Sequence, residues 1–290
     1  MIVAGASTHP GKFGFVALHN LLASGYRGKV FATNRNSAEV LGVSTVGSIE
    51  DIPPGEADLV VVCTPKDANV ELLEQCARIG VRAAFVTTAG YGESGEQGRT
   101  DEAELVEHCR RLGIRLAGPN GQGVVSTPSS LCAQIVAPYP PAGPIGVASQ
   151  SGNFVSSFLN LASASGVGIS RGVGRQRRGD RDRRLPPLLR RRSRDGGGSR
   201  LPRGHRRRTR PLRHLADHHS VQAGRDTEGG ATTSGARAAS SHTGSLATDD
   251  RVFDGACRQA GVTRAATVEQ AYEAAATLAT QPLRGVPESW

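Results

Sequence analysis

The chain lacks several features that mark other classes of protein. Its five cysteines are scattered and form no C-x-x-C pair, which favours reduced thiols over disulfides or a zinc site. No apolar run reaches the ~18 residues that a membrane span needs. A signal peptide requires a positively charged segment before its apolar run, and no such segment precedes the short apolar run at the N-terminus. These absences predict a cytoplasmic protein with no membrane association and no metal site.

Lysine is absent from residues 172–228, although arginine is abundant there. The segment holds 18 Arg and 6 acidic residues, a net charge of +12. The rest of the chain has 17 Lys and Arg against 20 acidic residues, so the formal charge of +9 comes from this one stretch. A run with so much charge and so few apolar residues cannot bury a core, and we expect it to be disordered.

The first half of the chain alternates short apolar runs with helical patterns. At 290 residues the chain is long enough for two domains. Strands alternating with helices imply a parallel sheet with right-handed crossovers, and ligands then bind at the carboxyl ends of the strands. The expected strands are residues 1–4, 29–34, 58–64, 81–90 and 114–120, with helices after the turn at 5–14, up to Gly80, and from about Thr100 to Leu112.

The first strand runs into a glycine-rich turn, GASTHPGKFG at 5–14, and then into a helix. A strand, a glycine-rich turn and a helix in this order form a typical phosphate-binding site, in which backbone N–H groups and the helix N-terminus point toward the phosphate. The turn is not a G-x-G-x-x-G, and the second strand ends in Asn34-Arg35-Asn36 rather than in the acidic residue that holds an NAD ribose. An arginine there suits an extra phosphate, as in NADP or the 3′-phosphate of coenzyme A. Alternatively, Arg35 is a solvated loop residue.

A second strand, turn and helix occupy residues 143–162. Ser149, Ser151 and Gly152 lie where the helix begins. Hydroxyl groups and free N–H groups at a helix N-terminus form an anion site, although a serine there also serves as a plain N-cap.

A single histidine, His242, lies downstream in a loop rich in Ser, Thr and Gly. A lone loop histidine is usually only solvated. An imidazole that faces a second helix start is a competent nucleophile toward phosphorus, because helix dipoles stabilise the phosphoryl group that it would carry.

Taken in order, these motifs resemble the CoA-binding part of the NDP-forming acyl-CoA synthetases, the superfamily of the succinyl-CoA synthetase α-subunit. The resemblance covers about 1–171 and 229–280. The matching segments are GASTHPGKFG (5–14), VTTAGYGESG (86–95), AGPNGQGVVSTP (117–128), ASQSGNF (148–154) and SHTGSLATDDRVFDGACRQAGV (241–262). One departure is Gly121, where many relatives carry Cys after Gly-Pro-Asn.

The resemblance implies an α/β fold: a Rossmann-like CoA-binding domain at 1–140 and a flavodoxin-like, succinyl-CoA synthetase-like domain at 141–290. It implies that His242 becomes the phosphohistidine. The residues implied to bind its phosphate are Ser149, Ser151, Gly152 and Gly244. The residues implied to hold CoA are Gly5, Ser7, Lys12, Gly14, Asn34, Arg35, Thr64 and Pro65.

The resemblance also implies an activity and a partner. Phosphate would pass between ATP or ADP, His242 and an acyl phosphate made from a small carboxylic acid, and CoA would take the acyl group. An ATP-grasp domain or β-type subunit, which would bind ATP and Mg²⁺, is missing from this chain.

The Arg-rich segment stands where the family carries a strand–helix–strand stretch with a Glu that orients the phosphohistidine. If G/C-rich codons are assumed and the reading frame is shifted by one base, the segment can encode two apolar strands, a helix between them and an acidic Tyr-Leu-Glu-Gly. We therefore hypothesise a compensated frameshift near Arg171 and again near Gly229. The missing Glu would overlap the codons of Pro202 and Arg203. As written, the chain would then be an impaired synthetase module.

Two other functions stay open on the sequence. One is a non-catalytic CoA- or NADP-binding regulatory protein. The other is nucleic-acid binding through the Arg-rich segment, whose charge would bind phosphate backbones without specificity. The segment has no aromatic residues for base stacking.

Overall fold

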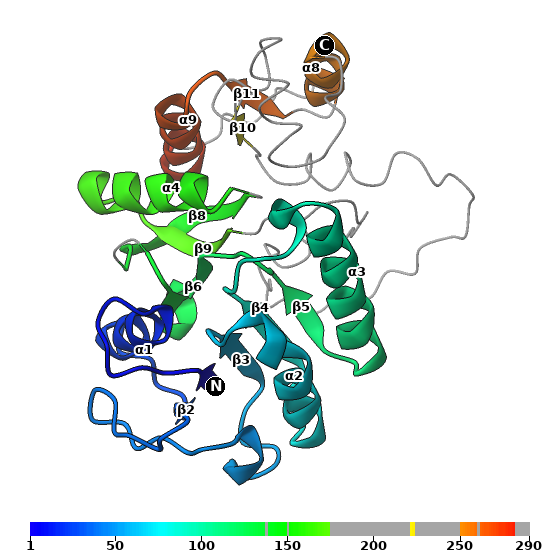
Figure 1. Ribbon diagram of the computed structural model, residues 1–290. Helices are drawn as coiled ribbons and strands as arrows, with labels where there is room; N and C mark the ends of the chain where they lie inside the picture. The colour runs from blue at the N-terminus through cyan, green and yellow to red at the C-terminus, as the bar shows by residue number, and fades with distance from the viewer. Residues whose placement is uncertain (137–138, 150, 175–220, 224–249, 260–261, 282–290) are drawn as a thin grey trace, which may run out of the picture. The chain divides into compact units, whose positions relative to one another are not determined.

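The computed structural model describes residues 1–136, 139–149, 151–174, 221–223, 250–259 and 262–281 (Figure 1). The chain divides into two compact units, residues 1–178 and 179–290. Within the described residues, no helix is long and apolar enough to cross a bilayer.

The first unit is built on a five-stranded parallel sheet in the order β2-β1-β3-β4-β5. Its strands are β1 (Ile2–Ala4), β2 (Phe31–Thr33), β3 (Leu59–Val62), β4 (Ala83–Val86) and β5 (Arg115–Ala117). Three helices connect them: α1 (Phe13–Ala23), α2 (Asn69–Arg78) and α3 (Glu96–Arg111). The predicted parallel sheet is confirmed.

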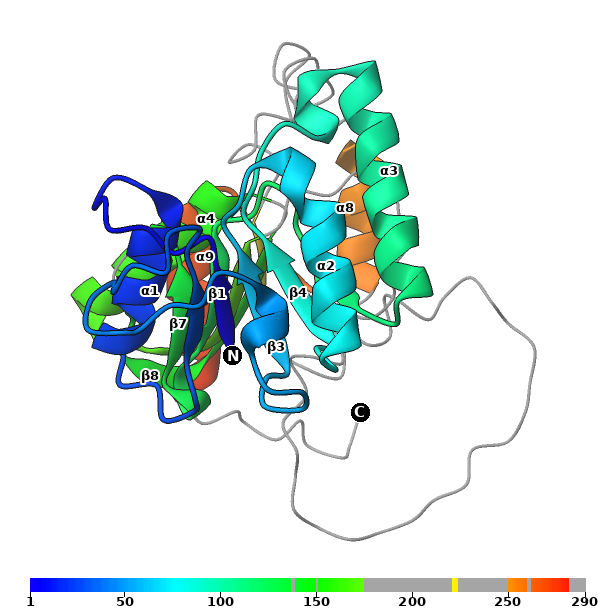
Figure 2. The ribbon, with the colours of Figure 1, turned by 60° about the horizontal axis from the view of Figure 1, so that its bottom comes forward.

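Alternate residues of each strand pack against different helices, because successive side chains of a strand point to opposite faces. Ile2 and Val60 belong to the buried cluster that includes the apolar sides of α2 and α3. Val3 and Val61 belong to the cluster that includes α1. Figure 2 shows α1 on one side of the sheet and α2 and α3 on the other.

Helix α3 begins earlier than the expected start near Thr100. It starts at Glu96, directly after Gly95, which has a φ of +103° and acts as the N-cap. Gly98 lies in the first turn, and a Cβ there would lie 1.9 Å from the carbonyl oxygen of Tyr91. Close packing of the helix on the preceding loop therefore requires glycine at this position, although glycine within a helix is normally destabilising.

A second sheet in the same unit has the order β7-β6-β9-β8. Its strands are β6 (Gly123–Ser126), β7 (Leu131–Gln134), β8 (Ala142–Ser149) and β9 (Ile169–Gly174). Strands β6 and β7 form an antiparallel hairpin, whereas β8 and β9 are parallel and joined by α4 (Gly152–Ser165). The β8–α4 strand and helix were predicted. The sheet draws strands from both sides of residue 140, and the domain boundary at 140 stays a prediction.

Within its described residues, the second unit has two short strands and two helices. Strand β10 (Val221–Ala223) pairs in parallel with β11 (Thr263–Ala265), and the helices are α8 (Asp250–Gln259) and α9 (Val268–Thr280). The Thr267 hydroxyl caps α9 by accepting from the N–H of Gln270 at 3.2 Å.

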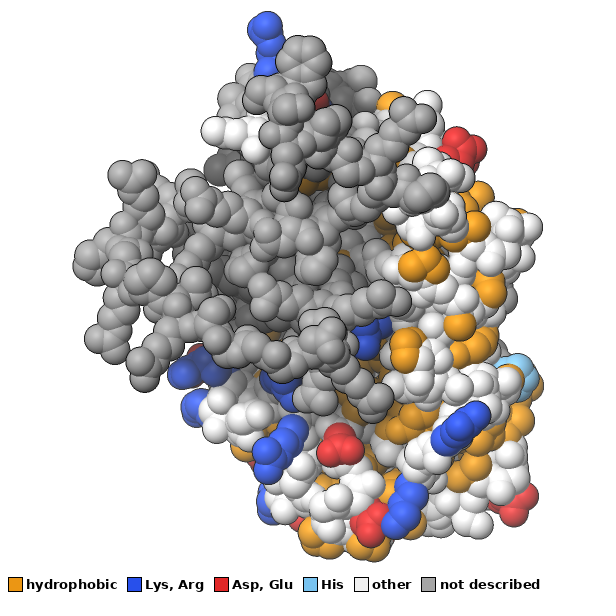
Figure 3. All heavy atoms as spheres, turned by 180° about the vertical axis from the view of Figure 1, so that it is seen from behind, with side chains coloured by type: hydrophobic (Ala, Val, Ile, Leu, Met, Phe, Trp, Pro, Cys, Tyr) orange, Lys and Arg blue, Asp and Glu red, His pale blue; other side chains and the backbone are white. Residues whose placement is uncertain are grey.

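Two short pieces of the Arg-rich segment are strand in this structure: the last three residues of β9 and all of β10. The rest of the segment lies outside the described residues, so the expectation of disorder stays a prediction for it. On the face drawn in Figure 3, the Lys and Arg side chains of the described residues are interspersed with Asp and Glu and form no single basic stripe.

Candidate functional site

The strand order of the first sheet reverses between β1 and β3, because the chain runs to β2 on one side of β1 and to β3 on the other. In open α/β sheets, ligands bind outside the carboxyl ends of the strands at such a switch point. The residues that follow β1 and β3 are therefore the first place to look for a site.

Gly5 and Gly14 bring the turn after β1 close to its neighbours. Gly5 has a φ of +80°, and a Cβ there would lie 3.0 Å from Cγ2 of Thr64. A Cβ at Gly14 would lie 2.0 Å from the carbonyl oxygen of Gly5. The first turn of α1 therefore packs directly on the end of β1, and only glycine permits that approach.

The end of β2 is tied to the same turn. The Gly5 N–H donates to the Thr33 hydroxyl at 3.1 Å, and the Asn34 side-chain amide donates to the Ala6 carbonyl at 2.8 Å. Of the predicted CoA residues, the structure thus brings Gly5, Asn34 and Thr64 together. Arg35 follows Asn34 and is exposed.

The other predicted CoA residues, Ser7, Lys12 and Pro65, are partly or fully exposed. The Ser7 hydroxyl accepts from the N–H of His9 at 3.0 Å. Lys12 is the N-cap of α1, is exposed, and makes no side-chain capping bond. Pro65 is exposed next to Thr64. These positions leave the Lys12 ammonium available to an anion in solution.

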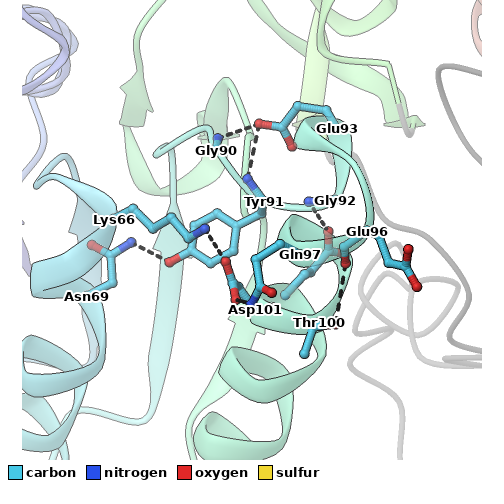
Figure 4. A network of polar contacts seen from close by, with 11 residues as sticks. Lys66, Asn69, Gly90, Tyr91, Gly92, Glu93, Glu96, Gln97, Thr100 and Asp101 are labelled. Atoms are coloured by element: carbon cyan, nitrogen blue, oxygen red, sulfur yellow. Dashed lines mark hydrogen bonds and ion pairs between the residues drawn. The ribbon is translucent and has the colours of Figure 1, made fainter.

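A buried polar network, which sequence reasoning missed, supports the ends of β3 and β4. The Thr64 hydroxyl donates to the side-chain oxygen of Asn69 at 2.9 Å. The Asn69 amide donates to the Tyr91 hydroxyl at 2.9 Å (Figure 4). Asn69 is fully buried. The Thr88 hydroxyl donates to the Thr64 carbonyl at 2.7 Å. The network fixes the backbone on which Thr64 is presented.

Two carboxylates hold the loop after β4. Glu93 accepts from the N–H groups of Gly90 and Tyr91, and Glu102 accepts from the N–H of Gly92 at 3.1 Å (Figure 4). The predicted family motif at 86–95 therefore contains a loop in which carboxylates of the chain accept from three successive backbone N–H groups, those of residues 90–92.

Beside this loop, the Lys66 ammonium pairs with Asp101 and lies 5.1 Å from the centre of the Tyr91 ring. The hydrogen bond from Lys66 lowers the pKa of the Asp101 carboxyl, and the same bond raises the pKa of Lys66. These residues line a groove of about 750 Å³ along α3. None of the predicted site residues lines it.

Cys63 lies next to the candidate site but is unsuited to nucleophilic chemistry. Burial raises the pKa of its thiol to about 11, against a smaller opposite effect of the Thr87 hydroxyl. The thiol therefore stays protonated at neutral pH, whereas the thiolate is the nucleophile.

The predicted phosphate-binding residues Ser149, Ser151 and Gly152 meet at the start of α4. Ser151 is the N-cap, and its hydroxyl accepts from the N–H of Phe154 at 3.3 Å. The Ser149 hydroxyl accepts from the N–H of Ser151 at 3.0 Å. His242 and Gly244 lie outside the described residues. Among the described residues, no cluster of three or more His, Cys, Asp or Glu could hold a metal ion.

Comparison with known proteins gives two family matches. Residues 1–127 match the CoA binding domain, and residues 227–278 match the succinyl-CoA ligase like flavodoxin domain. The order of these domains, together with the parallel sheet, confirms the predicted fold class.

Two relatives come from Pyrococcus furiosus. The α subunit of its acetate–CoA ligase [ADP-forming] I is 32% identical over 97% of this chain and 62% of the relative. The α subunit of its acetate–CoA ligase [ADP-forming] II is 33% identical over 97% of this chain and 61% of the relative. The chain thus spans less than two thirds of these relatives.

A solved structure is also similar. It is the "Ca. Korarchaeum cryptofilum" dinucleotide forming acetyl-coenzyme A synthetase 1 in complex with phosphate and ADP, with a TM-score of 0.83 and 29% identity. The match covers 99% of this chain and 62% of that chain.

Proposed function

Because the chain belongs to the superfamily of NDP-forming acyl-CoA synthetases, we propose that it is the CoA-binding portion of an ADP-forming acyl-CoA synthetase. One observation carries this proposal. The glycine-rich turn of the CoA-binding domain packs, through Gly5 and Gly14, against the switch point of a parallel sheet. A phosphate-bearing ligand is favoured there by free backbone N–H groups and a helix N-terminus.

Within this proposal, CoA lies along the carboxyl ends of β1, β2 and β3. Gly5, Gly14 and Ser7 border its pyrophosphate, Lys12 and Arg35 supply positive charge, and Asn34 orders the turn that carries Arg35. Thr64 and Pro65 lie on the far side of the switch point. Arg35 is the residue that would meet the 3′-phosphate, because guanidinium pairs with phosphate through two parallel hydrogen bonds.

The CoA assignment is tested by thermal stabilisation of the full chain. A ligand that binds only the folded state raises the melting temperature by mass action. We expect CoA to raise it and NADPH to leave it unchanged. Stabilisation by NADPH and not by CoA would instead support the regulatory Rossmann-type protein.

The second part of the proposal concerns phosphoryl transfer. Ser149, Ser151 and Gly152 at the start of α4 would bind the phosphoryl group carried by His242, and an ATP-grasp partner would hold ATP and Mg²⁺. The phosphoryl group would pass to a small carboxylic acid, and the CoA thiol would then attack the acyl phosphate and release phosphate.

Free cysteines throughout the chain support a reducing compartment, the cytoplasm, as its location.

We also propose that this step is impaired in the chain as written. The Arg-rich sequence stands where the family carries the Glu that orients the phosphohistidine. The family match to the flavodoxin domain begins at residue 227, at the end of that segment. Labelled ATP and an ATP-grasp partner should therefore leave no stable label on His242, and strong labelling would overturn the impairment. Resequencing codons 165–235 tests the frameshift itself.

A further inference from the structure

A glutamine from outside α4 covers the first turn of that helix. The Gln122 side chain donates from Nε2 to Oδ1 of Asn153 at 2.8 Å, and its Oε1 accepts from the Ser156 hydroxyl at 2.7 Å. A Cβ at Gly152 would lie 2.5 Å from Cδ of Gln122. The side chain of Gln122 therefore occupies the space that Gly152 leaves open.

Sheet register explains why Gln122 reaches this helix. Gly123 pairs with Gly174, and Ser149 pairs with the same Gly174, so the start of β6 lies in one row with the end of β8. Gln122 comes one residue before this row. It therefore lies just beyond the edge of the sheet at which α4 begins.

The backbone that carries Gln122 is fixed to the other sheet. The N–H of Asn120 donates to the Thr88 carbonyl at 2.9 Å, and the N–H of Gly121 donates to the Val86 carbonyl at 3.3 Å. A Cβ at Gly118 would lie 2.2 Å from the Val86 carbonyl oxygen, which shows how closely this loop lies on the end of β4. Residues 118–122 thus join the ligand-binding edge of the first sheet to the start of α4.

We infer that Gln122 is a positioning residue, which holds the phosphate-binding turn of α4 in a fixed place relative to the CoA-binding edge. This inference rests on the proposed function. Transfer of an acyl group to CoA requires the phosphate-bearing group and the thiol to meet in one geometry, and small misplacements weaken such sites strongly. Gln122 supplies the rigid connection through two hydrogen bonds and through packing on Gly152.

The test uses the full chain and inorganic phosphate as the probe. Gln122→Met keeps the length and packing of the side chain but removes both hydrogen bonds, and Gln75→Met on α2 is the matched control. Phosphate affinity is measured from the ³¹P resonance and CoA affinity by calorimetry. We expect Gln122→Met to weaken phosphate binding about tenfold, because the turn that binds phosphate is no longer held in place. CoA affinity should stay close to that of the wild type, and the melting temperature should fall slightly, because two hydrogen bonds within the chain are lost.

A charged variant separates positioning from a general structural role. Gln122→Glu keeps the bond from Ser156 but sets a negative charge beside Gly152. It should weaken phosphate binding more than Gln122→Met does, and added salt should recover part of the difference. A general loss of structure would weaken CoA binding too, and would not respond to salt in this way.

The outcomes distinguish the inference from the proposed function. Wild-type phosphate affinity in Gln122→Met would overturn the inference, as would a parallel loss of CoA affinity. A wild-type chain that binds CoA but no phosphate would also overturn it and leave the CoA assignment standing. A wild-type chain that binds phosphate but no CoA would overturn the proposed function.

Discussion

Replacing Gly14 by alanine tests the packing of the candidate CoA site. The added Cβ would lie 2.0 Å from the Gly5 carbonyl oxygen and 3.0 Å from Cα of Ala6. A Cβ essentially never lies closer than 3.0 Å to such an atom, so the first turn of α1 and the end of β1 must move apart by roughly 1 Å. Both partners are backbone, and neither can rotate out of the way. The shift therefore falls on the turn that is proposed to surround the pyrophosphate.

The expected energies follow from two opposed effects. Overpacking a close contact costs about 1–3 kcal/mol, whereas alanine in a helix is favoured over glycine by about 1 kcal/mol. The free energy of unfolding should therefore fall by at most about 2 kcal/mol, which lowers the melting temperature by at most about 8 °C. CoA affinity should fall at least about tenfold, because a displacement of about 1 Å misaligns every donor of the turn.

Gly11→Ala in the same turn is the matched control. Its Cβ would meet only the ring of His9, at 3.3 Å, and that exposed ring needs to shift by only a few tenths of an ångström. We expect stability within about 0.5 kcal/mol of the wild type and unchanged CoA affinity. Calorimetric titration with CoA, at a temperature at which both variants are folded, measures the effect. If Gly14→Ala binds CoA as tightly as Gly11→Ala does, the assignment of CoA to this turn is wrong.

Three further predictions concern charge and burial. Arg35→Ala should weaken CoA binding about tenfold, since charge-assisted hydrogen bonds are stronger than neutral ones, and should leave the binding of dephospho-CoA unaffected. Equal losses for both ligands, or an equal loss in the control Arg27→Ala, would contradict a contact with the 3′-phosphate. The Lys66 hydrogen bond lowers the pKa of Asp101 below 3.8, so its stabilising contribution is present above that pH and is lost as the pH falls through the lowered value. The difference in melting temperature between the wild type and Asp101→Asn should therefore vanish in strong acid, and a difference that persists at the lowest pH would refute this cause. Burial raises the pKa of the Cys76 thiol to about 12, so iodoacetamide at pH 8 should label it only in urea, as peptide mass mapping would show; labelling in the folded chain would contradict its burial.

The first sheet could be predicted because its sequence signals are local. The inner strands are apolar runs such as Leu59–Val62, whose residues are mostly buried, and the strands are followed by turns or helices with their own signals. Gly5 and Gly14 were found as parts of a glycine-rich turn. Both positions require glycine because the backbones of β1 and α1 approach one another closely, and this approach is visible only in the folded chain.

The hairpin of β6 and β7 could not be predicted in the same way. Each strand has four residues. The two strands pair with one another, and β6 also pairs with β9, whose residues lie 45 to 51 positions further along the chain. Local sequence does not specify such a register. Gln122 and Asn69 were missed for a related reason. Their hydrogen bonds join segments that are separated in sequence, and single polar residues in a loop or helix carry no local signal of burial.

The most direct test of the central claim is to map CoA binding by backbone NMR on the full chain. The account predicts that CoA shifts the amide resonances of residues 5–14, of Asn34 and Arg35, and of Thr64, while the amides of β7 and β8 stay unchanged. Shifts confined to other regions, or no shifts at saturating CoA, would contradict the placement of the CoA site at the switch point of the first sheet.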